Sequence, residues 1–183
     1  MNFLNVYIIT GDQGAGKTSF LSVIAGLLKK NGILPGGILA IGEWKNEERT
    51  GFKIEDIHTG LQMPLAYRES QKEWYSLGKF YFNPSSVSYG NSLLQSEDIL
   101  KNDVIILDEI GPFELKNEIW ATGLNHLCKS YKGILILSVR KSLVRQVISH
   151  WGFTHAEIID INQVAEVEMV KKINELIEKN EDN

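Results

Sequence analysis

The chain has 183 residues, of which 43% are hydrophobic and 23% charged, and its formal net charge is -4 at pH 7. This length and apolar content predict a single domain with one core over residues 1–183. The net negative charge argues against a general binder of nucleic acid or membrane surfaces, because such proteins usually present a basic face. We expect a monomer with neither nucleic acid nor a membrane as partner.

The first 32 residues predict a strand, a glycine-rich turn and a helix. Residues 3–10, FLNVYIIT, form a short apolar run without a basic flank, which is typical of a buried strand and not of a signal peptide. Residues 11–19 then read GDQGAGKTS. Residues 18–32 end in Lys-Lys-Asn-Gly, a typical helix C-terminus, and carry one apolar stripe. The stripe consists of Phe20, Ile24, Leu27 and Leu28.

The middle third predicts an antiparallel addition to the sheet. Residues 37–41 have the composition of a buried strand and are followed by a polar turn. Residues 51–59 and 62–67 then read as the two strands of a hairpin. We expect this pair to extend the main sheet.

The last third alternates strands with helices. Residues 103–109 and 133–139 are runs of Ile, Leu and Val without clean alternation, which is typical of parallel strands covered on both faces. Residues 116–133, 141–152 and 162–180 have helical patterns. The alternation predicts an α/β fold, in which a mostly parallel sheet is flanked by helices in three layers and carries a small antiparallel hairpin extension.

The sequence also favours a cytoplasmic protein. No apolar run approaches the roughly 20 residues that span a bilayer. Cys128 is the sole cysteine, so it has no partner for an internal disulfide. A reducing compartment is therefore expected.

The glycine-rich turn predicts a phosphate-binding loop. The pattern G-x-x-x-x-G-K-[ST] is met by Gly11, Gly16, Lys17 and Thr18. Glycines let consecutive main-chain amides converge on phosphate, and the following helix N-terminus adds partial positive charge. Lys17 is expected on the β- and γ-phosphates and the Thr18 hydroxyl on Mg²⁺. The predicted nucleotide-binding residues are Gly11, Asp12, Gln13, Gly14, Ala15, Gly16, Lys17, Thr18 and Ser19.

Two adjacent acids complete the predicted site. Asp108 ends the apolar run VIIL, as expected of a Walker B aspartate that holds magnesium. Side chains of adjacent strand residues point to opposite faces, so Glu109 can serve a different purpose from Asp108. We expect Glu109 to orient or deprotonate the attacking water.

An arginine commonly stabilises the charge that builds on the γ-phosphate during transfer. The chain has four arginines, at positions 49, 68, 140 and 145. Arg140 follows the strand at 133–139, at the sheet edge where α/β proteins bind ligands, and is the first candidate. Arg145 and Arg49 are the reserves. The predicted catalytic residues are therefore Lys17, Glu109 and Arg140.

With both motifs in place, the sequence resembles the small P-loop nucleoside-triphosphatases, a family with human and thermophilic microbial members. The resemblance runs through most of the chain. It implies a Mg²⁺-dependent enzyme that accepts several nucleoside triphosphates, including ATP and GTP, and slowly releases the diphosphate and phosphate. The family's loop and Asp-Glu roles carry over to Gly16, Lys17, Thr18, Asp108 and Glu109. Its motifs are GGILA at 36–40, ERTGF at 48–52, HTGLQMPLA at 58–66, LGKFYFN at 77–83 and DEIG at 108–111.

The chain departs from the family pattern at two places. Family members commonly continue DEIG with Lys-Met-Glu, whereas Pro112, Phe113 and Glu114 follow here. Near the C-terminus, relatives often show Asn-Arg where this chain has Asn162 and Gln163. Each departure removes a cation that the family pattern would place near the phosphates.

Two other functions remain open at this level. The first is a small-molecule or nucleotide kinase on the same fold. Such enzymes usually close an arginine-bearing lid over the phosphate donor, and the four scattered arginines of this chain do not form an obvious lid of this kind. The second is a nucleotide-dependent adapter resembling the P-loop proteins of molybdopterin-cofactor assembly. The absence of an Asn-Lys-x-Asp motif argues against a regulatory GTPase.

Overall fold

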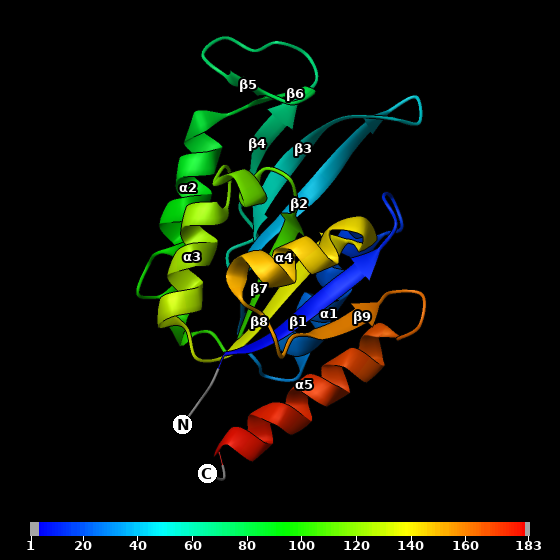
Figure 1. Cartoon of the computed structure of the whole chain (residues 1–183), viewed down its shortest axis with the longest axis vertical. Coiled ribbons are helices and arrows are strands. Elements are labelled where there is room, and N and C mark those ends of the chain that lie inside the picture. Colours follow the sequence, from blue (N-terminus) through cyan, green and yellow to red (C-terminus); the bar gives the residue numbers. More distant parts are fainter. Residues whose placement is uncertain (1–3, 182–183) are drawn as a thin grey trace.

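One mixed sheet runs through the molecule, and its parallel half leads into the glycine-rich turn. In the computed structural model, which describes residues 4–181, the strand order is β5-β6-β4-β3-β2-β7-β8-β1-β9 (Figure 1). The strands from β2 onward in this order are parallel to one another. They are β2 (Pro35–Lys45), β7 (Val104–Ile110), β8 (Ile134–Arg140), β1 (Asn5–Gly11) and β9 (Glu157–Asp160).

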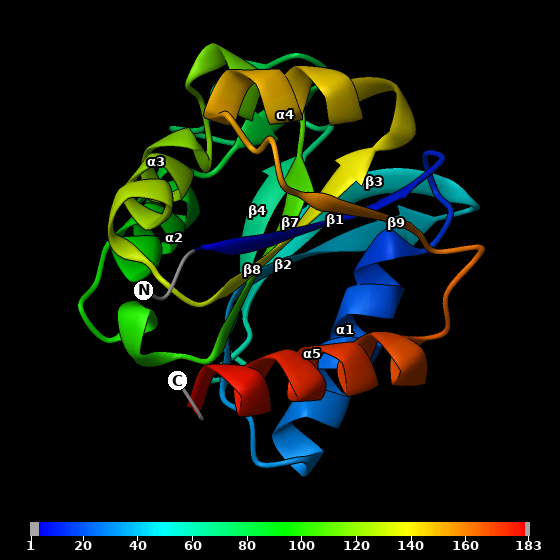
Figure 2. The same ribbon diagram turned by 60° about the horizontal axis from the view of Figure 1, so that its bottom comes forward.

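Helices cover both faces of the parallel strands, which explains why these strands are apolar without alternation. In β1, Val6 and Ile8 pack with residues of α2, α3 and α4, whereas Tyr7 and Ile9 pack with residues of α1 and α5. Figure 2 shows α4 on one side of the sheet and both α1 and α5 on the other side. The three layers confirm the predicted α/β fold. The helices are α1 (Lys17–Lys30), α2 (Pro84–Leu94), α3 (Ala121–Ser130), α4 (Val144–Trp151) and α5 (Glu166–Glu181), with 3-10 turns η1 (Ile99–Lys101), η2 (Glu114–Lys116) and η3 (Lys141–Leu143).

The predicted antiparallel extension is confirmed and is larger than expected. β3 (Glu48–Asp56) pairs antiparallel with β2, and β4 (Gln62–Tyr67) with β3. Two short strands continue this edge, β6 (Phe80–Phe82) beside β4 and β5 (Tyr75–Leu77) beside β6. The strand β6 lies in the segment 77–83 that the family resemblance singles out.

The strand β2 is longer than the predicted 37–41 and belongs to both halves of the sheet. Its first residues pair with β7, and its last residues extend past that strand in the hairpin with β3. Asn46 and Glu47 form the two-residue turn, with φ of 51° and 64°. Two consecutive positive φ values are typical of a type I′ turn, whose twist matches that of the paired strands.

The predicted helix at 116–133 is wrong in its first turn. The α-helix covers only Ala121–Ser130. The chain before it passes through η2 and then adopts left-handed conformations at Asn117 and Ile119, with φ of 63° and 46°. Left-handed residues cannot continue a right-handed helix, so the helix begins later than its apolar pattern.

Other boundaries also differ from the prediction. The segment 141–152 starts with the 3-10 turn η3 before α4, and α5 begins at Glu166 rather than at 162. The helix α2 and the strand β9 are not predicted at all. An Asn-Pro start marks α2, because the Asn83 side chain accepts from the amide of Ser85 and Pro84 takes the first helical position. None of the helices in residues 4–181 is long and apolar enough to cross a membrane.

Gly37 sets how closely β2 approaches β7. Its φ is +109°, and a Cβ built on it would lie 2.0 Å from the main-chain oxygen of Ile106. Gly37 pairs with Ile106 in the parallel register, which in turn pairs Ile38 with Leu107. The residues that follow on the two strands form the site described below, so this glycine fixes the spacing that the site needs.

We expect Gly37→Ala to lower the free energy of unfolding by more than about 2 kcal/mol, because it combines a strained φ with a clash against backbone. Gly26→Ala is the matched control, since Gly26 lies in α1 and a Cβ there meets nothing within 4 Å. That change should raise the free energy of unfolding by about 0.5–1 kcal/mol. Urea denaturation measures both, and equal effects would contradict this account of Gly37.

Candidate active site

The glycine-rich turn joins β1 directly to α1. β1 ends at Gly11 and α1 starts at Lys17. Gly14 and Gly16 have φ of 79° and 92°, a conformation that glycine adopts at no steric cost. The amide of Phe20 donates to the carbonyl of Gly16, which closes the first turn of the helix. Residues 12–16 are exposed, so the main chain of the loop is accessible to a ligand at the helix N-terminus.

Lys17 lies beneath this loop. Its side chain is buried, and its Nζ donates to the carbonyl oxygens of Gly11 at 3.1 Å and Asp12 at 2.8 Å. Burial lowers the pKa of the ammonium group, and the negative charges of Glu109 and Asp108 oppose that shift. The cation therefore lies inside the turn, where the charges of both acids act on it.

Asp108 connects four elements of the fold. It is fully buried, and its Oδ2 accepts from Thr18 Oγ1 of α1 at 2.7 Å and from the amide of Ala40 in β2 at 3.1 Å. Its Oδ1 accepts from Ser138 Oγ of β8 and from the amide of Glu109 at 3.0 Å. Burial, reinforced by the charge of Glu109, raises the pKa of this carboxyl to about 6, although the hydrogen bonds from Ser138, Thr18 and Ala40 act in the opposite direction.

The donor set at Asp108 fits a magnesium ion. Thr18 and Asp108 offer hard oxygen atoms 2.7 Å apart. Mg²⁺ at nucleotide sites takes one or two protein oxygens and completes its octahedron with phosphate oxygens and water. No group of three or more His, Cys, Asp or Glu residues in the described part of the chain could hold a metal ion by itself. These residues suit a metal that arrives with the nucleotide.

Ser138 is absent from the residues predicted from sequence. It is fully buried, and its Oγ both donates to Asp108 Oδ1 and accepts from the amide of Glu109 at 2.8 Å. A hydroxyl inside the apolar run GILILSV is the one available signal, because a buried polar group needs a partner. The partner could not be named without the strand order.

Glu109 interrupts the regular strand geometry of β7. The strand register of β7 with β8 shifts between Leu107 and Ile110, and Glu109 has a φ of 63°. A non-glycine residue in this conformation is strained, and such residues cluster at functional sites. The Glu109 side chain is 29% exposed and lines two neighbouring cavities.

The first of these, the loop cavity, has a volume of about 470 Å³. It is lined by part of the predicted phosphate loop and by Thr18, one of the two predicted metal ligands, together with the end of β2 and Arg49 of β3. The second, the aromatic cavity, has a volume of about 90 Å³ and lies toward the antiparallel extension. The loop cavity is lined by Gly14, Gly16, Lys17, Thr18, Trp44, Arg49 and Glu109, and the aromatic cavity by Phe52, Phe80, Phe82, Phe113, Glu109 and Arg140, among others.

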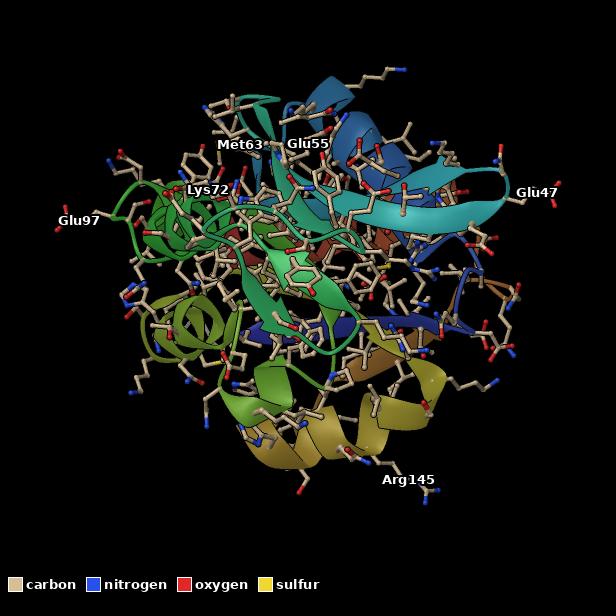
Figure 3. The ribbon with its side chains drawn as sticks, turned by 90° about the horizontal axis from the view of Figure 1, so that it is seen from above. Glu47, Glu55, Met63, Lys72, Glu97 and Arg145 are labelled. Atoms are coloured by element: carbon tan, nitrogen blue, oxygen red, sulfur yellow. The ribbon has the colours of Figure 1, made fainter. Side chains whose placement is uncertain are left out.

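The four arginines lie in different parts of the structure, and only two of them adjoin Glu109. Arg140 ends β8 opposite Gly11 of β1 and lines the aromatic cavity beside Glu109. Arg49 lines the loop cavity, and its Nη1 lies 3.9 Å from Glu109 Oε1. Arg145 is exposed on α4 and points away from the molecule (Figure 3), which removes it as a candidate. Arg68 pairs with Glu48 at the surface.

The two departures from the family pattern have different structural settings. Phe113 packs edge-on against Phe82, with ring centroids 5.6 Å apart, so it belongs to the wall of the aromatic cavity. Glu114 is buried and accepts from the amide of Gly111 at 2.8 Å, and burial raises the pKa of its carboxyl to about 7. Asn162 lies in the exposed turn after β9, where its amide donates to Asp160.

Known proteins share both the sequence pattern and the fold. Nucleoside-triphosphatase THEP1 of Caldivirga maquilingensis is 23% identical over 169 residues, which cover 92% of this chain and 91% of that protein. THEP1 of Methanosarcina acetivorans is 30% identical over 129 residues, or 69% and 71% of the two chains.

Two solved structures share the fold. The solution structure of a human cancer-related nucleoside triphosphatase has a TM-score of 0.71 at 17% identity and covers 96% of this chain and 98% of its own. The crystal structure of THEP1 from Aquifex aeolicus has a TM-score of 0.63 at 20% identity, with 85% and 89% covered. A family model described as NTPase matches residues 6–177. Because this match spans nearly the whole chain, the protein belongs to the NTPase family.

Proposed function

We propose that this chain hydrolyses nucleoside triphosphates to the diphosphate and phosphate with Mg²⁺, and that it tolerates several bases. The observation that carries the proposal is the position of Glu109. Its carboxylate lines the same cavity as Lys17, Thr18 and the loop glycines, one residue from the Asp108 carboxylate that Thr18 binds. A base beside a phosphate-binding loop is the arrangement that a hydrolytic water requires.

In this mechanism the loop amides of residues 11–19 bind the β- and γ-phosphates, and Lys17 turns its ammonium group from the loop carbonyls toward their oxygens. A Mg²⁺ ion held by Thr18 and Asp108 would neutralise charge on the phosphates. Glu109 orients a water in the loop cavity and accepts its proton as the water oxygen bonds to the γ-phosphorus. The bond from that phosphorus to the bridging oxygen breaks, and the diphosphate keeps the electron pair.

Arg140 remains the proposed cation for charge on the transferring group. It adjoins Glu109 from the aromatic cavity, and its charge acts on Lys17, whose pKa it helps to lower. Of the three arginines considered from sequence, Arg145 points away from the molecule, and only Arg140 and Arg49 remain as candidates beside Glu109. The cytoplasm is the proposed location and a monomer the proposed state.

The primary test is phosphate release from ATP, GTP, CTP and UTP with Mg²⁺ and no added acceptor. We expect release from all four, because the sequence lacks the Asn-Lys-x-Asp motif that reads guanine and the proposed chemistry involves only the phosphates. Chelation of Mg²⁺ should abolish release. Phosphate transfer that requires an added acceptor would instead favour a kinase, and release that requires a protein partner would favour an adapter.

Lys17→Ala should weaken nucleotide binding by at least about tenfold, because it removes a charge-assisted contact to phosphate. Binding of a fluorescent nucleotide measures the effect. Lys30→Ala is the matched control, because Lys30 is exposed at the opposite end of the same helix. Equal affinities in both variants would exclude Lys17 from the phosphate site.

Glu109→Gln should still bind nucleotide but release phosphate about 10²–10⁴ times more slowly, because the amide cannot accept the proton of the water. Glu97→Gln is the control, since Figure 3 shows Glu97 at the periphery of the molecule, pointing into solvent. Single-turnover phosphate release separates the chemical step from binding. A Glu109→Gln rate equal to that of the unaltered protein would refute the role of Glu109.

A further inference from the structure

Arg49 is held at the edge of the loop cavity by two aromatic rings. Its guanidinium carbon lies 4.7 Å from the Trp44 ring centroid and 4.8 Å from that of Phe52. Trp44 pairs with Arg49 across the β2–β3 hairpin, at a register shift between Glu43 and Trp44. Bulges of this kind often re-aim side chains next to active sites. The hairpin thus presents a cation stacked between rings at a fixed point.

Gly42 leaves the space that the Arg49 side chain occupies. A Cβ at Gly42 would lie 3.3 Å from Arg49 Nε and 3.0 Å from Trp44 Nε1. Gly42 lines the loop cavity with Arg49, Lys17 and Glu109. The arginine therefore crosses over a residue without a side chain and reaches the predicted phosphate site from the side of β2.

Arg49 faces Glu109 without forming a strong hydrogen bond to it. The shortest ion-pair distance, 3.9 Å from Nη1 to Oε1, lies beyond hydrogen-bond range. The two side chains are 20% and 29% exposed, so the pair is only partly screened by solvent. The Nε of Arg49 is buried and has no hydrogen-bond partner among the described residues. A buried donor that lacks a partner beside a phosphate loop has capacity to bind an anion.

We propose that Arg49 senses the γ-phosphate: its guanidinium pairs with Glu109 until a triphosphate is bound, then binds the terminal phosphate and leaves Glu109 to the water. The inference rests on the proposed hydrolysis. A γ-phosphate offers three oxygens and up to two negative charges to a planar donor fork, which is a stronger partner than a carboxylate at this distance. Arg49 would then distinguish substrate from product, because a diphosphate lacks that group.

This role differs from the one proposed for Arg140. Arg140 adjoins Glu109 from the aromatic cavity and does not line the loop cavity, where the γ-phosphate is expected. Arg49 lines that cavity and stacks on Trp44, whose side chain is largely exposed. A change in the position of Arg49 should therefore alter the surroundings of an indole and provide an optical signal.

The test compares the affinity of a non-hydrolysable β,γ-imido triphosphate with that of the diphosphate, both with Mg²⁺, by calorimetry. In Arg49→Gln we expect the triphosphate analogue to bind about tenfold or more weakly, while diphosphate affinity changes less than about twofold. Arg49→Lys should restore part of the difference, because it keeps the charge without the fork. Arg68→Gln is the matched control and should leave both affinities unchanged, since Arg68 pairs with Glu48 at the surface.

A second measurement does not depend on a stable Arg49 variant. In the unaltered protein, the triphosphate analogue should change a component of tryptophan emission that Trp44→Phe removes, and the diphosphate should not. An Arg49→Gln variant that folds, as judged by circular dichroism, and keeps the original preference for triphosphate would overturn the inference. So would a Trp44-dependent signal that is the same for both nucleotides, or absent for both. These are binding measurements, so they stand apart from phosphate release, whose absence in the unaltered protein would instead reject the proposed hydrolysis.

Discussion

The candidate active site depends on one buried carboxylate. Asp108 has no exposed surface, and its two oxygens accept hydrogen bonds from α1, β2, β8 and its own strand. A buried charge is costly unless it is paired or hydrogen-bonded, so each of these elements must be in place for the carboxylate to be tolerated. The contact between α1 and the end of β7, made by Thr18 and Asp108, therefore depends on the positions of the other strands. The site thus depends on the same strand and helix neighbours that define the fold.

The glycine-rich turn and the Asp-Glu pair could be identified from sequence because each is a local pattern. Glycines with positive φ, a lysine at the helix start and an acid after an apolar run follow from short-range chemistry. The three-layer fold could also be predicted, since strands without alternation must be covered on both faces. The predicted helix boundaries are wrong where the backbone conformation of single residues interrupts a helical sequence pattern. The helical pattern predicted for 116–133 includes Asn117 and Ile119, but the left-handed backbone at these two residues delays the helix.

The parts of the site that could not be predicted depend on which strands are neighbours. β8 lies between β1 and β7, so Ser138 lies where it can bind Asp108, but no spacing in the sequence encodes that order. The arginines pose the same problem. Arg140 follows a strand at the expected edge and adjoins Glu109, whereas Arg49 reaches Glu109 from a hairpin whose bulge and neighbouring glycine are visible only in the structure. Contacts that depend on pairing between strands far apart in the sequence can be identified only from the structure.

The backbone at Glu109 has a consequence for how this protein can change. A left-handed conformation costs a residue with a Cβ about 1–2 kcal/mol, and glycine avoids that cost. A drift toward glycine at this position would make the molecule more robust to heat while removing the carboxylate that faces the loop cavity. Under the catalytic role proposed for Glu109, stability therefore favours glycine at this position, whereas turnover favours the acid.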